Sequence, residues 1–322
     1  MAGRFRSTEK VIVLQILLAL YNGAEYLPEF LGSLDAQTNQ QWTLSARDDG
    51  SQDGTVQIAT DYCATRGPGN VVVTGNNVGV IRNFSLLLEH ADADYVMLAD
   101  QDDVWYSSKI ATSLAAIKKL ESESGGIDVP ALVFTDLHVI DANMKLVDRS
   151  FVRSQGLLRL ALPCPVFRRL LTQNLAPGCT MIVNRSLLKR ALPVPSSAVM
   201  HDWWLIQVAA LLGVVGFVDE PTIAYRQHGS NQIGATSLSV GSVLRDLMQG
   251  GRRYKNRIRH AQVQAASLLQ RYGELMSEQE AGAVKAFATL SEQRLLTRQW
   301  IAYRHRLSKT GAIRNIGFYF LM

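Results

Sequence analysis

The chain has 322 residues and is 47% hydrophobic, which is enough apolar material for a large buried core and excludes an extended disordered protein. Its net charge of +5 is unevenly distributed, because residues 241–322 hold 14 Lys and Arg against 5 Asp and Glu, whereas residues 1–240 hold 19 against 23. A basic tail of this kind indicates a negatively charged surface as partner. We expect no nucleic acid as partner, since no recognised nucleic-acid-binding motif accompanies the charge.

The start of the chain resembles a signal peptide in one respect, since three cations precede the apolar run Val11–Leu20. No small-x-small cleavage site follows, so we interpret this run as a buried strand. No uninterrupted apolar stretch reaches the roughly 18 residues that span a bilayer. The cysteines are odd in number and lack metal-ligand spacing, which favours a reduced, cytoplasmic setting. They are Cys63, Cys164 and Cys179.

Strands and helices are expected to alternate along most of the chain. The expected strands are Val11–Leu20, Gln41–Arg47, Asn70–Thr74, Tyr95–Asp100 and Ala131–Ile140. The expected helices are Glu25–Gln37, Thr55–Thr65, Ile81–His90 and Lys109–Ser122. Alternation of this kind predicts an α/β fold with a mostly parallel central sheet covered by helices on both faces. The irregular stretch Val147–Phe167 is interpreted either as an excursion over the acceptor side or as a plain connection.

The most informative segment is the apolar run Tyr95–Ala99, which leads directly into Asp100, Asp102 and Asp103. Carboxylates clustered at a strand end need a cation to offset their repulsion, and hard oxygen ligands suit Mg²⁺ or Mn²⁺ shared with a phosphate. In open α/β sheets, ligands bind outside the carboxyl ends of the strands. The alternative is a solvated acidic turn that caps the next helix.

A second strand ends in Asp48 and Asp49, followed by glycines that allow a tight turn. A carboxylate at this position can accept from the N–H of a nucleobase or from ribose hydroxyls. The loop Asn76–Asn83 precedes a helix and is either turn chemistry or a donor contact, with Arg82 facing phosphate and Asn83 a hydroxyl. Three strand ends therefore converge on one edge of the predicted sheet.

Taken together, these motifs and three later ones resemble family 2 glycosyltransferases, which have the nucleotide-sugar-binding fold called GT-A. The resemblance covers about residues 10–235, and its last two motifs are most similar to the bacterial rhamnosyltransferase-like branch. The motifs are Ala19–Asn22, Asp48–Ser51 with Asp53–Thr55, Asn77–Asn83, Asp100–Asp103, Gly178–Thr180, His201–Trp204 and Tyr225–Asn231.

The resemblance implies a GT-A catalytic domain over residues 11–238, after an N-terminal tail of residues 1–10 and before a basic helical C-terminal extension of residues 239–322. It also implies which side chains bind the donor nucleotide, although Ala19 can contact the base only through its backbone. These donor residues are Ala19, Tyr21, Asn22, Asp48, Asp49, Gly79, Arg82, Asn83, Asp100 and Gln101. The divalent cation, Mg²⁺ or Mn²⁺, is assigned to Asp102 and His228, while Asp103 is interpreted as structural.

By the same resemblance Asp202 is the general base of an inverting transfer, because one carboxylate suffices when the leaving diphosphate is stabilised by metal. The alternative gives Asp202 a helix-capping role and packs both neighbouring tryptophans into the core. The residues assigned to the acceptor or sugar pocket are Gly178, His201, Trp203, Trp204 and Arg226.

The branch of the family implies dTDP-rhamnose as donor and a lipid-linked oligosaccharide of a growing cell-surface polysaccharide as acceptor. UDP- and GDP-sugars remain alternative donors. A non-catalytic sugar-binding protein is the alternative of another class. A nucleotidyltransferase is disfavoured, because the loop Tyr21–Glu25 lacks the basic residue that such enzymes carry after their first strand. The expected location is the cytoplasm, at the inner face of the membrane.

The basic extension has two interpretations. Its cations at the start of a long helix form either a solvated helical face or an interfacial helix on anionic lipid. The cations are Arg252, Arg253, Lys255, Arg257 and Arg259. The final apolar segment, Ile316–Met322, is expected to dip into a membrane or to pack on a partner subunit.

Overall fold

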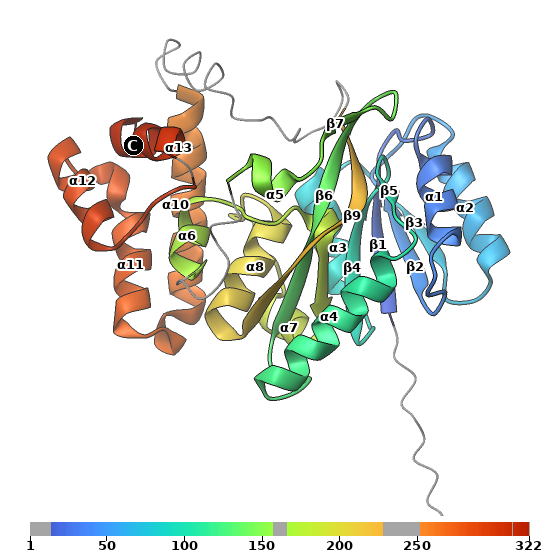
Figure 1. Cartoon of the computed structure of the whole chain (residues 1–322), viewed down its shortest axis with the longest axis horizontal. Helices are drawn as coiled ribbons and strands as arrows, with labels where there is room; N and C mark the ends of the chain where they lie inside the picture. The colour runs from blue at the N-terminus through green and yellow to red at the C-terminus, as the bar shows by residue number, and fades with distance from the viewer. Residues whose placement is uncertain (1–13, 157–165, 228–251, 311, 322) are drawn as a thin grey trace, which may run out of the picture.

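The computed structural model describes residues 14–156, 166–227, 252–310 and 312–321, and shows a twisted sheet flanked by helices, with a helical extension at one end (Figure 1). The strands are β1 (Leu14–Leu20), β2 (Thr43–Asp48), β3 (Val71–Thr74), β4 (Tyr95–Asp100), β5 (Val104–Trp105), β6 (Ala131–Asp141), β7 (Leu146–Asp148), β8 (Met181–Asn184) and β9 (Val214–Gln227). The helices of the first 212 residues are α1 (Leu27–Asp35), α2 (Thr55–Arg66), α3 (Val80–Glu89), α4 (Lys109–Ser124), α5 (Phe151–Ser154), α6 (Val166–Thr172), α7 (Arg185–Ala191) and α8 (His201–Leu212).

The sheet has the strand order β3-β2-β1-β4-β8-β6-β9-β5, with β7 paired to β6. Its first four strands are parallel, as the alternating pattern predicts. Beyond them β8 is antiparallel to both β4 and β6, whereas β6 and β9 are parallel. The α/β prediction is confirmed, but the sheet is mixed, because strands and long helices stop alternating after β6 and antiparallel neighbours need no helical crossover.

Each strand supplies two faces of the core, since successive side chains point to opposite sides of a sheet. On one face, Ile16 and Leu18 of β1 pack with residues of α1 and α4, including Phe30. On the other face, Leu17 joins a cluster that reaches α3, α8 and the C-terminal helices, including Phe287. The helical extension therefore shares a core with the sheet domain.

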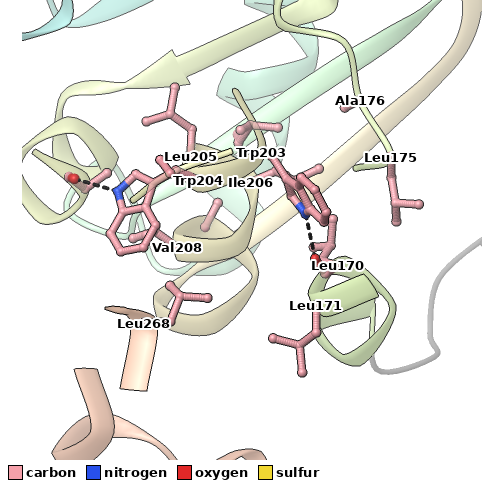
Figure 2. Packing of buried hydrophobic residues seen from close by; sticks show 14 of the residues in the cluster. Leu170, Leu171, Leu175, Ala176, Trp203, Trp204, Leu205, Ile206, Val208 and Leu268 are labelled. Atoms are coloured by element: carbon pink, nitrogen blue, oxygen red, sulfur yellow. Dashed lines mark hydrogen bonds between the residues drawn. The ribbon is translucent and has the colours of Figure 1, made fainter. Parts of the chain in front are cut away.

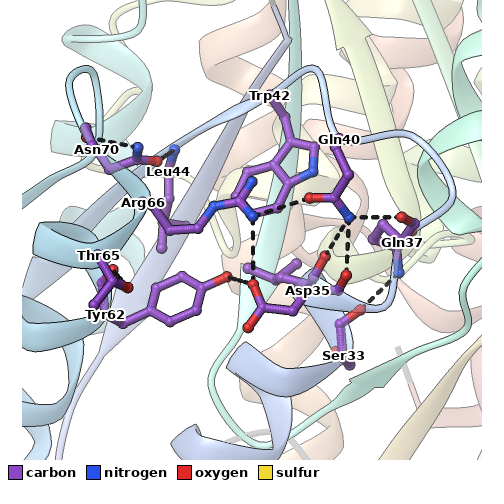
Figure 3. Close-up of polar contacts among 12 residues, drawn as sticks. Ser33, Asp35, Gln37, Gln40, Trp42, Leu44, Tyr62, Thr65, Arg66 and Asn70 are labelled. Atoms are coloured by element: carbon purple, nitrogen blue, oxygen red, sulfur yellow. Dashed lines mark hydrogen bonds and ion pairs between the residues drawn. The ribbon is translucent and has the colours of Figure 1, made fainter.

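The outer edge near β2 is held by a polar cluster between α1 and α2, in which Figure 3 shows the side chains converging on Asp35. The Tyr62 hydroxyl donates to Asp35 Oδ1 at 2.8 Å, and Arg66 donates to Gln40 Oε1 at 3.0 Å. The Arg66 guanidinium also lies 4.0 Å above the centre of the Trp42 ring. These contacts fix α1 and α2 to the strand that ends in Asp48.

The described part of the extension contains four α-helices, which lie beside α6 and α8, away from α1 and α2 (Figure 1). They are α10 (Arg252–Tyr272), α11 (Glu278–Ala288), α12 (Leu295–Arg304) and α13 (Ala312–Leu321). Gln264 of α10 donates to Gln207 Oε1 of α8 at 2.6 Å, and Gln207 donates to the Leu170 carbonyl of α6 at 2.8 Å. Phe318 of α13 is fully buried, so the last helix packs at least partly on its own chain. Among the described residues no helix is both long and apolar enough to cross a membrane.

Candidate active site

The predicted convergence of three strand ends is present in the structure. Leu20 of β1 lies opposite Asp48 of β2, and Ala19 lies opposite Asp100 of β4. The loops that follow are joined by Gln101, whose amide donates to the Tyr21 carbonyl at 2.8 Å and accepts from the Tyr21 N–H at 2.9 Å. The acidic loop and the first loop are thus fixed to each other side by side.

The first loop is also tied to the second. Asn22 has a left-handed backbone with φ of 45°, its N–H donates to Ser51 Oγ at 2.8 Å, and its side chain accepts from the Gln52 N–H at 2.8 Å. A Cβ at Gly23 would lie 2.2 Å from the end of the Gln101 side chain, so any larger residue would displace Gln101 from its hydrogen bonds to Tyr21. Tyr21 and Asn22 therefore shape the predicted donor edge through their backbone as well as their side chains.

Asp48 and Asp49, predicted to contact the nucleoside, have carboxylates that already hold the backbone. Asp48 Oδ2 accepts from the N–H groups of Gly50 and Ser51 at 3.0 and 2.9 Å. Asp49 accepts from the Gly79 N–H at 2.8 Å and pairs with Arg47 at 2.8 Å. Both aspartates are buried, so the structure gives them a loop-holding role, and direct contact with a nucleoside stays a prediction.

Arg82 and Asn83 occupy different environments although they are neighbours in the sequence. Arg82 is exposed and pairs with Glu89 at 2.7 Å on its own helix. Asn83 is buried, accepts from Arg47 Nη1 at 2.9 Å, and donates to the Arg47 carbonyl at 3.2 Å. Asn83 therefore stabilises Arg47, which in turn holds Asp49. Arg82 is paired with Glu89, and its contact with a phosphate stays a prediction.

Replacing Asn83 by Ala is expected to destabilise the protein by about 1–3 kcal/mol, because the guanidinium and the carbonyl of Arg47 each lose one buried hydrogen bond, although the guanidinium keeps Asp49. Chemical denaturation monitored by circular dichroism measures the change. The matched control is Arg82→Ala, which removes only an exposed ion pair and is expected to change stability by less than about 1 kcal/mol. Equal effects of the two substitutions would contradict the structural role of Asn83.

The acidic loop brings Asp100 and Asp103 together with Cys179, with one ligand-type atom of each lying within 4.8 Å of the others. Burial, followed by repulsion from Asp102 and then Asp202, raises the pKa of Asp100 to about 7. Burial and the nearby Asp102 likewise raise the pKa of Asp103 well above its usual value. These carboxyls repel one another in a desolvated site, which is the electrostatic condition that a bound cation relieves.

The residues present fit a hard divalent cation. Asp103 Oδ2 is buried and has no hydrogen-bond partner among the described residues, and Asp100 lies beside it with part of its surface exposed. Burial, followed by the nearby Asp103 and Asp100, raises the pKa of the Cys179 thiol well above its ordinary value. Oxygen ligands of this kind suit Mg²⁺ or Mn²⁺. His228, the second predicted ligand, lies outside the described residues.

Lys109 belongs to this cluster and was not among the predicted site residues. Lys109, the first residue of α4, is fully buried, with its ammonium 4.6 Å from the centre of the Trp105 ring and without a hydrogen-bond partner among the described residues. Burial lowers its pKa to about 8, while Cys179 and Asp103 act in the opposite direction. The only sequence signal for Lys109 is a lysine at the apolar start of a helix six residues after Asp103.

Arg226 was predicted to face the sugar or a phosphate, and this prediction does not match the structure. Its side chain is buried behind the acidic loop, donates to the Asp102 carbonyl at 3.0 Å and the Ala142 carbonyl at 3.2 Å, and pairs with Glu29. Its guanidinium also lies 5.0 Å from the centre of the Tyr26 ring. Arg226 therefore supports the backbone of Asp102, because its donors are directed to protein acceptors.

Asp202 lies in the first turn of α8, where the positive end of the helix dipole favours a negative charge. Its Oδ2 accepts from the Gly178 N–H at 2.9 Å. A Cβ at Gly178 would lie 3.3 Å from both Asp202 Cβ and His201 Nε2, which explains the glycine at this close approach. Burial raises the pKa of Asp202 to about 6 although hydrogen bonds from Trp203, Gly178 and Asn174 act to lower it. This carboxylate contributes to the raised pKa of Asp100, so it lies within electrostatic reach of the acidic loop.

Trp203 and Trp204, which the sequence assigns to the acceptor or sugar pocket, do not present their rings to a pocket in the structure. Figure 2 shows both indoles within the apolar cluster, where Trp203 Nε1 donates to the Leu170 carbonyl at 2.6 Å and Trp204 Nε1 donates to the Ala191 carbonyl at 2.8 Å. Both side chains are buried, because α8 is covered by α6, α7 and α10. The alternative interpretation as core residues is the one that matches the structure.

His201 stacks on Phe84, with ring centres 4.1 Å apart. Burial lowers its pKa to about 3, so the imidazole is neutral, and its Nδ1 has no hydrogen-bond partner among the described residues. One face of the ring contacts Phe84 of α3, and its Nε2 lies near Gly178. It is close to the predicted base, although its contacts are those of a packed side chain.

The sequence is similar to known glycosyltransferases. Residues 15–170 match the profile described as Glycosyl transferase family 2. The dTDP-rhamnosyl transferase RfbG of Shigella flexneri is 26% identical over 241 residues, which cover 68% of this chain and 74% of that protein. The putative glycosyltransferase EpsE of Bacillus subtilis is 28% identical over 105 residues, covering 32% of this chain and 38% of that protein.

Solved structures agree at the level of the fold. TarS of S. aureus in complex with UDP-GlcNAc has a TM-score of 0.55 and 14% identity, covering 91% of this chain and 79% of that one. The mannosyltransferase PcManGT of Pyrobaculum calidifontis in complex with GDP-Man and Mn²⁺ has a TM-score of 0.51 and 14% identity, covering 91% and 72%. The fold, the matched profile and the convergent strand ends agree: residues 15–170 form a family 2 glycosyltransferase domain, and the chain has the GT-A fold of the glycosyltransferase structures it resembles.

Proposed function

We propose that this enzyme transfers a sugar, with inversion, from a nucleoside-diphosphate sugar to an acceptor hydroxyl, and that Asp202 is the general base. The observation that carries the proposal is a buried carboxylate with a pKa of about 6, held by the Gly178 N–H within electrostatic reach of the acidic strand end. A base with a pKa near the working pH is suited to removing a proton as the hydroxyl attacks.

In the proposed mechanism, the donor nucleotide lies along the edge formed by Ala19–Asn22 and the loop that follows β2. The acceptor hydroxyl approaches from the side of α8 and gives its proton to an oxygen of Asp202. Gly178 keeps this carboxylate oriented, because its N–H bonds one carboxylate oxygen directly. The buried position of Asp202 keeps bulk water away from this carboxylate.

Asp100 and Asp102, which lie at the accessible rim of the acidic loop, would hold a divalent cation, together with the buried Oδ2 of Asp103 beside Asp100. When bound, the cation supplies neutralisation of the negative charge that develops on the departing diphosphate. The related mannosyltransferase of Pyrobaculum calidifontis, whose complex contains Mn²⁺, supports this part of the proposal.

We further propose dTDP-rhamnose as the donor, with a lipid-linked oligosaccharide of a growing cell-surface polysaccharide as acceptor. The similarity to the dTDP-rhamnosyl transferase of Shigella flexneri supports this choice. Complexes of the structural relatives with UDP-GlcNAc and GDP-Man favour UDP- and GDP-sugars as the alternative donors. A lipid-linked acceptor would place the enzyme at the inner face of the cytoplasmic membrane.

Thermal unfolding in the presence of dTDP, UDP, GDP and CDP, each with and without Mn²⁺, tests the donor and the cation together. A ligand at 100 times its dissociation constant stabilises the native state by about 2.7 kcal/mol, so a selective shift identifies the base. We expect the largest shift with dTDP and Mn²⁺ together. A preference for UDP or GDP would reject the rhamnose donor, and no shift with any nucleotide would favour a non-catalytic protein instead.

The pH dependence of transfer is a second test, because Asp202 accepts a proton only when it is ionised. With a pKa of about 6, the ionised fraction falls tenfold for each pH unit below that value. We therefore expect kcat/KM to rise with pH up to about 6 and then to level. Initial rates between pH 4.5 and pH 8 with saturating Mn²⁺ measure the profile, and a flat profile would reject Asp202 as base.

A further inference from the structure

The short helix α12 exposes an apolar face that nothing in the described chain covers. Leu296, Trp300 and Tyr303 are four and three residues apart, so they lie on one side of the helix, and they are 79%, 59% and 79% exposed. Ala302, on the opposite side, is fully buried against the extension. A helix of a soluble domain usually directs such residues to its core, so a contiguous exposed face indicates an interaction surface.

The charge around this face has one sign. The segment from Gln293 to Thr310 contains no Asp or Glu. Its cations are Arg294, Arg298, Arg304, Arg306 and Lys309. The guanidinium of Arg304 lies 5.4 Å from the centre of the Trp300 ring, so cation and aromatic group are presented together. Exposed indole and phenol rings among arginines are typical of a surface that meets the lipid–water boundary.

A basic hollow lies between α12 and α10, on the side of α12 that carries Arg298 and away from Leu296 and Trp300. It has a volume of about 130 Å³ and is lined by Lys255, Ile258 and Arg259 of α10, together with Ser291 and Arg298. Three of the five lining residues are cationic and none is acidic. Since a water molecule occupies about 30 Å³, the hollow has room for a phosphate group.

We propose that the exposed face of α12 docks on a bilayer that contains anionic lipid. Leu296, Trp300 and Tyr303 enter the boundary between headgroups and acyl chains, while the surrounding arginines contact lipid phosphates. A second copy of this chain is the poorer occupant, because two surfaces of the same strong positive charge repel each other. This docking rests on the proposed lipid-linked acceptor and names α12 as the element that faces the membrane. The sequence had indicated other elements, namely the cations of α10 and the final apolar segment.

The fluorescence of Trp300 tests this proposal directly in the full-length protein. The chain has five tryptophans, and the other four are buried. Vesicles of phosphatidylcholine with phosphatidylglycerol are expected to shift the emission to shorter wavelength, and lipids brominated in the acyl chains are expected to quench it. Vesicles of phosphatidylcholine alone should give a much smaller change. No shift and no co-sedimentation with the anionic vesicles would overturn the proposal.

Variants distinguish the α12 face from general basic attraction. Combining Leu296→Ser, Trp300→Ser and Tyr303→Ser is expected to weaken co-sedimentation with the anionic vesicles by roughly tenfold or more. The control combines Ile127→Ser and Val147→Ser, which are 62% and 61% exposed elsewhere on the molecule, and should leave binding unchanged. Undiminished binding of the triple variant, or equal loss in the control, would reject α12 as the docking element.

The test of membrane docking can fail or succeed independently of the test of the proposed sugar transfer. Stabilisation of the triple variant by nucleotide and Mn²⁺ should equal that of the unmodified chain, because α12 contributes no residue to the acidic strand end. Membrane binding without nucleotide stabilisation would reject the proposed donor chemistry and retain the docking face. Nucleotide stabilisation without membrane binding would do the reverse.

Discussion

Replacing Asp202 by Asn is expected to lower the rate of sugar transfer by about 10²–10⁴-fold while leaving donor binding intact. Asparagine has nearly the same shape and can still accept from the Gly178 N–H, but it cannot take the acceptor proton. The measurement is initial-rate kinetics with donor and acceptor, combined with thermal stabilisation by the donor nucleotide and Mn²⁺. The pH dependence of the residual rate should also lose the limb near pH 6.

The matched control is Asp219→Asn, which changes an exposed carboxylate of β9 that pairs with Arg153 at 2.9 Å. This variant should transfer sugar at the unmodified rate. Undiminished transfer by the Asp202 variant would remove Asp202 as base. Loss of nucleotide stabilisation together with activity would instead mean that the carboxylate shapes the donor site, so both readouts are needed from the same preparation.

Replacing Trp204 by Ala is expected to destabilise the protein by about 3–5 kcal/mol, since a fully buried indole is removed from a close-packed cluster. The substitution also removes one of the two hydrogen bonds to the Ala191 carbonyl, leaving that from Arg271, and removes the ring whose centre lies 6.0 Å from that of Tyr272. Because Tyr272 belongs to α10, the loss should loosen the contact between the extension and the sheet domain. Urea unfolding followed by circular dichroism measures the difference.

Trp300→Ala is the control for this prediction, because Trp300 is 59% exposed on α12 and its removal creates no cavity. Its free energy of unfolding should change by less than about 0.5 kcal/mol. A stable Trp204 variant with impaired transfer would contradict the core assignment and restore this tryptophan to the sugar pocket. Together, the Trp204 and Trp300 variants test whether Trp204 is a core residue or part of the sugar pocket.

The first half of the fold was predictable because its helices and strands have strong periodic signals. All expected helices and strands up to β6 are present with small differences in their ends, for example α4 at Lys109–Ser124 against the expected Lys109–Ser122. The direction of β8 was not predictable, since four buried residues after a short 3₁₀ turn contain no information on which neighbour they pair with.

The strand ends of the site were predictable for the same reason, because parallel strands place their carboxyl ends on one edge. Which carboxylates are accessible was not. Asp48, Asp49 and Asp103 are buried by backbone and side-chain partners that lie far from them in the sequence or in a turn. The roles of the two tryptophans after Asp202 were not predictable either. An indole at the start of a helix can stack on a sugar or pack in the core, and only the positions of the covering helices decide between these roles.

The hydrogen bonds between Gln101 and Tyr21, and between Asn22 and the loop after β2, have a consequence for the thermodynamics of donor recognition. Loops that become ordered on binding lose conformational entropy, and this loss subtracts from affinity. These hydrogen bonds join the three strand ends to one another through protein groups alone. A nucleotide bound as proposed would meet a preformed frame, and selectivity among bases should then follow from the shape of that frame rather than from loop closure around the base.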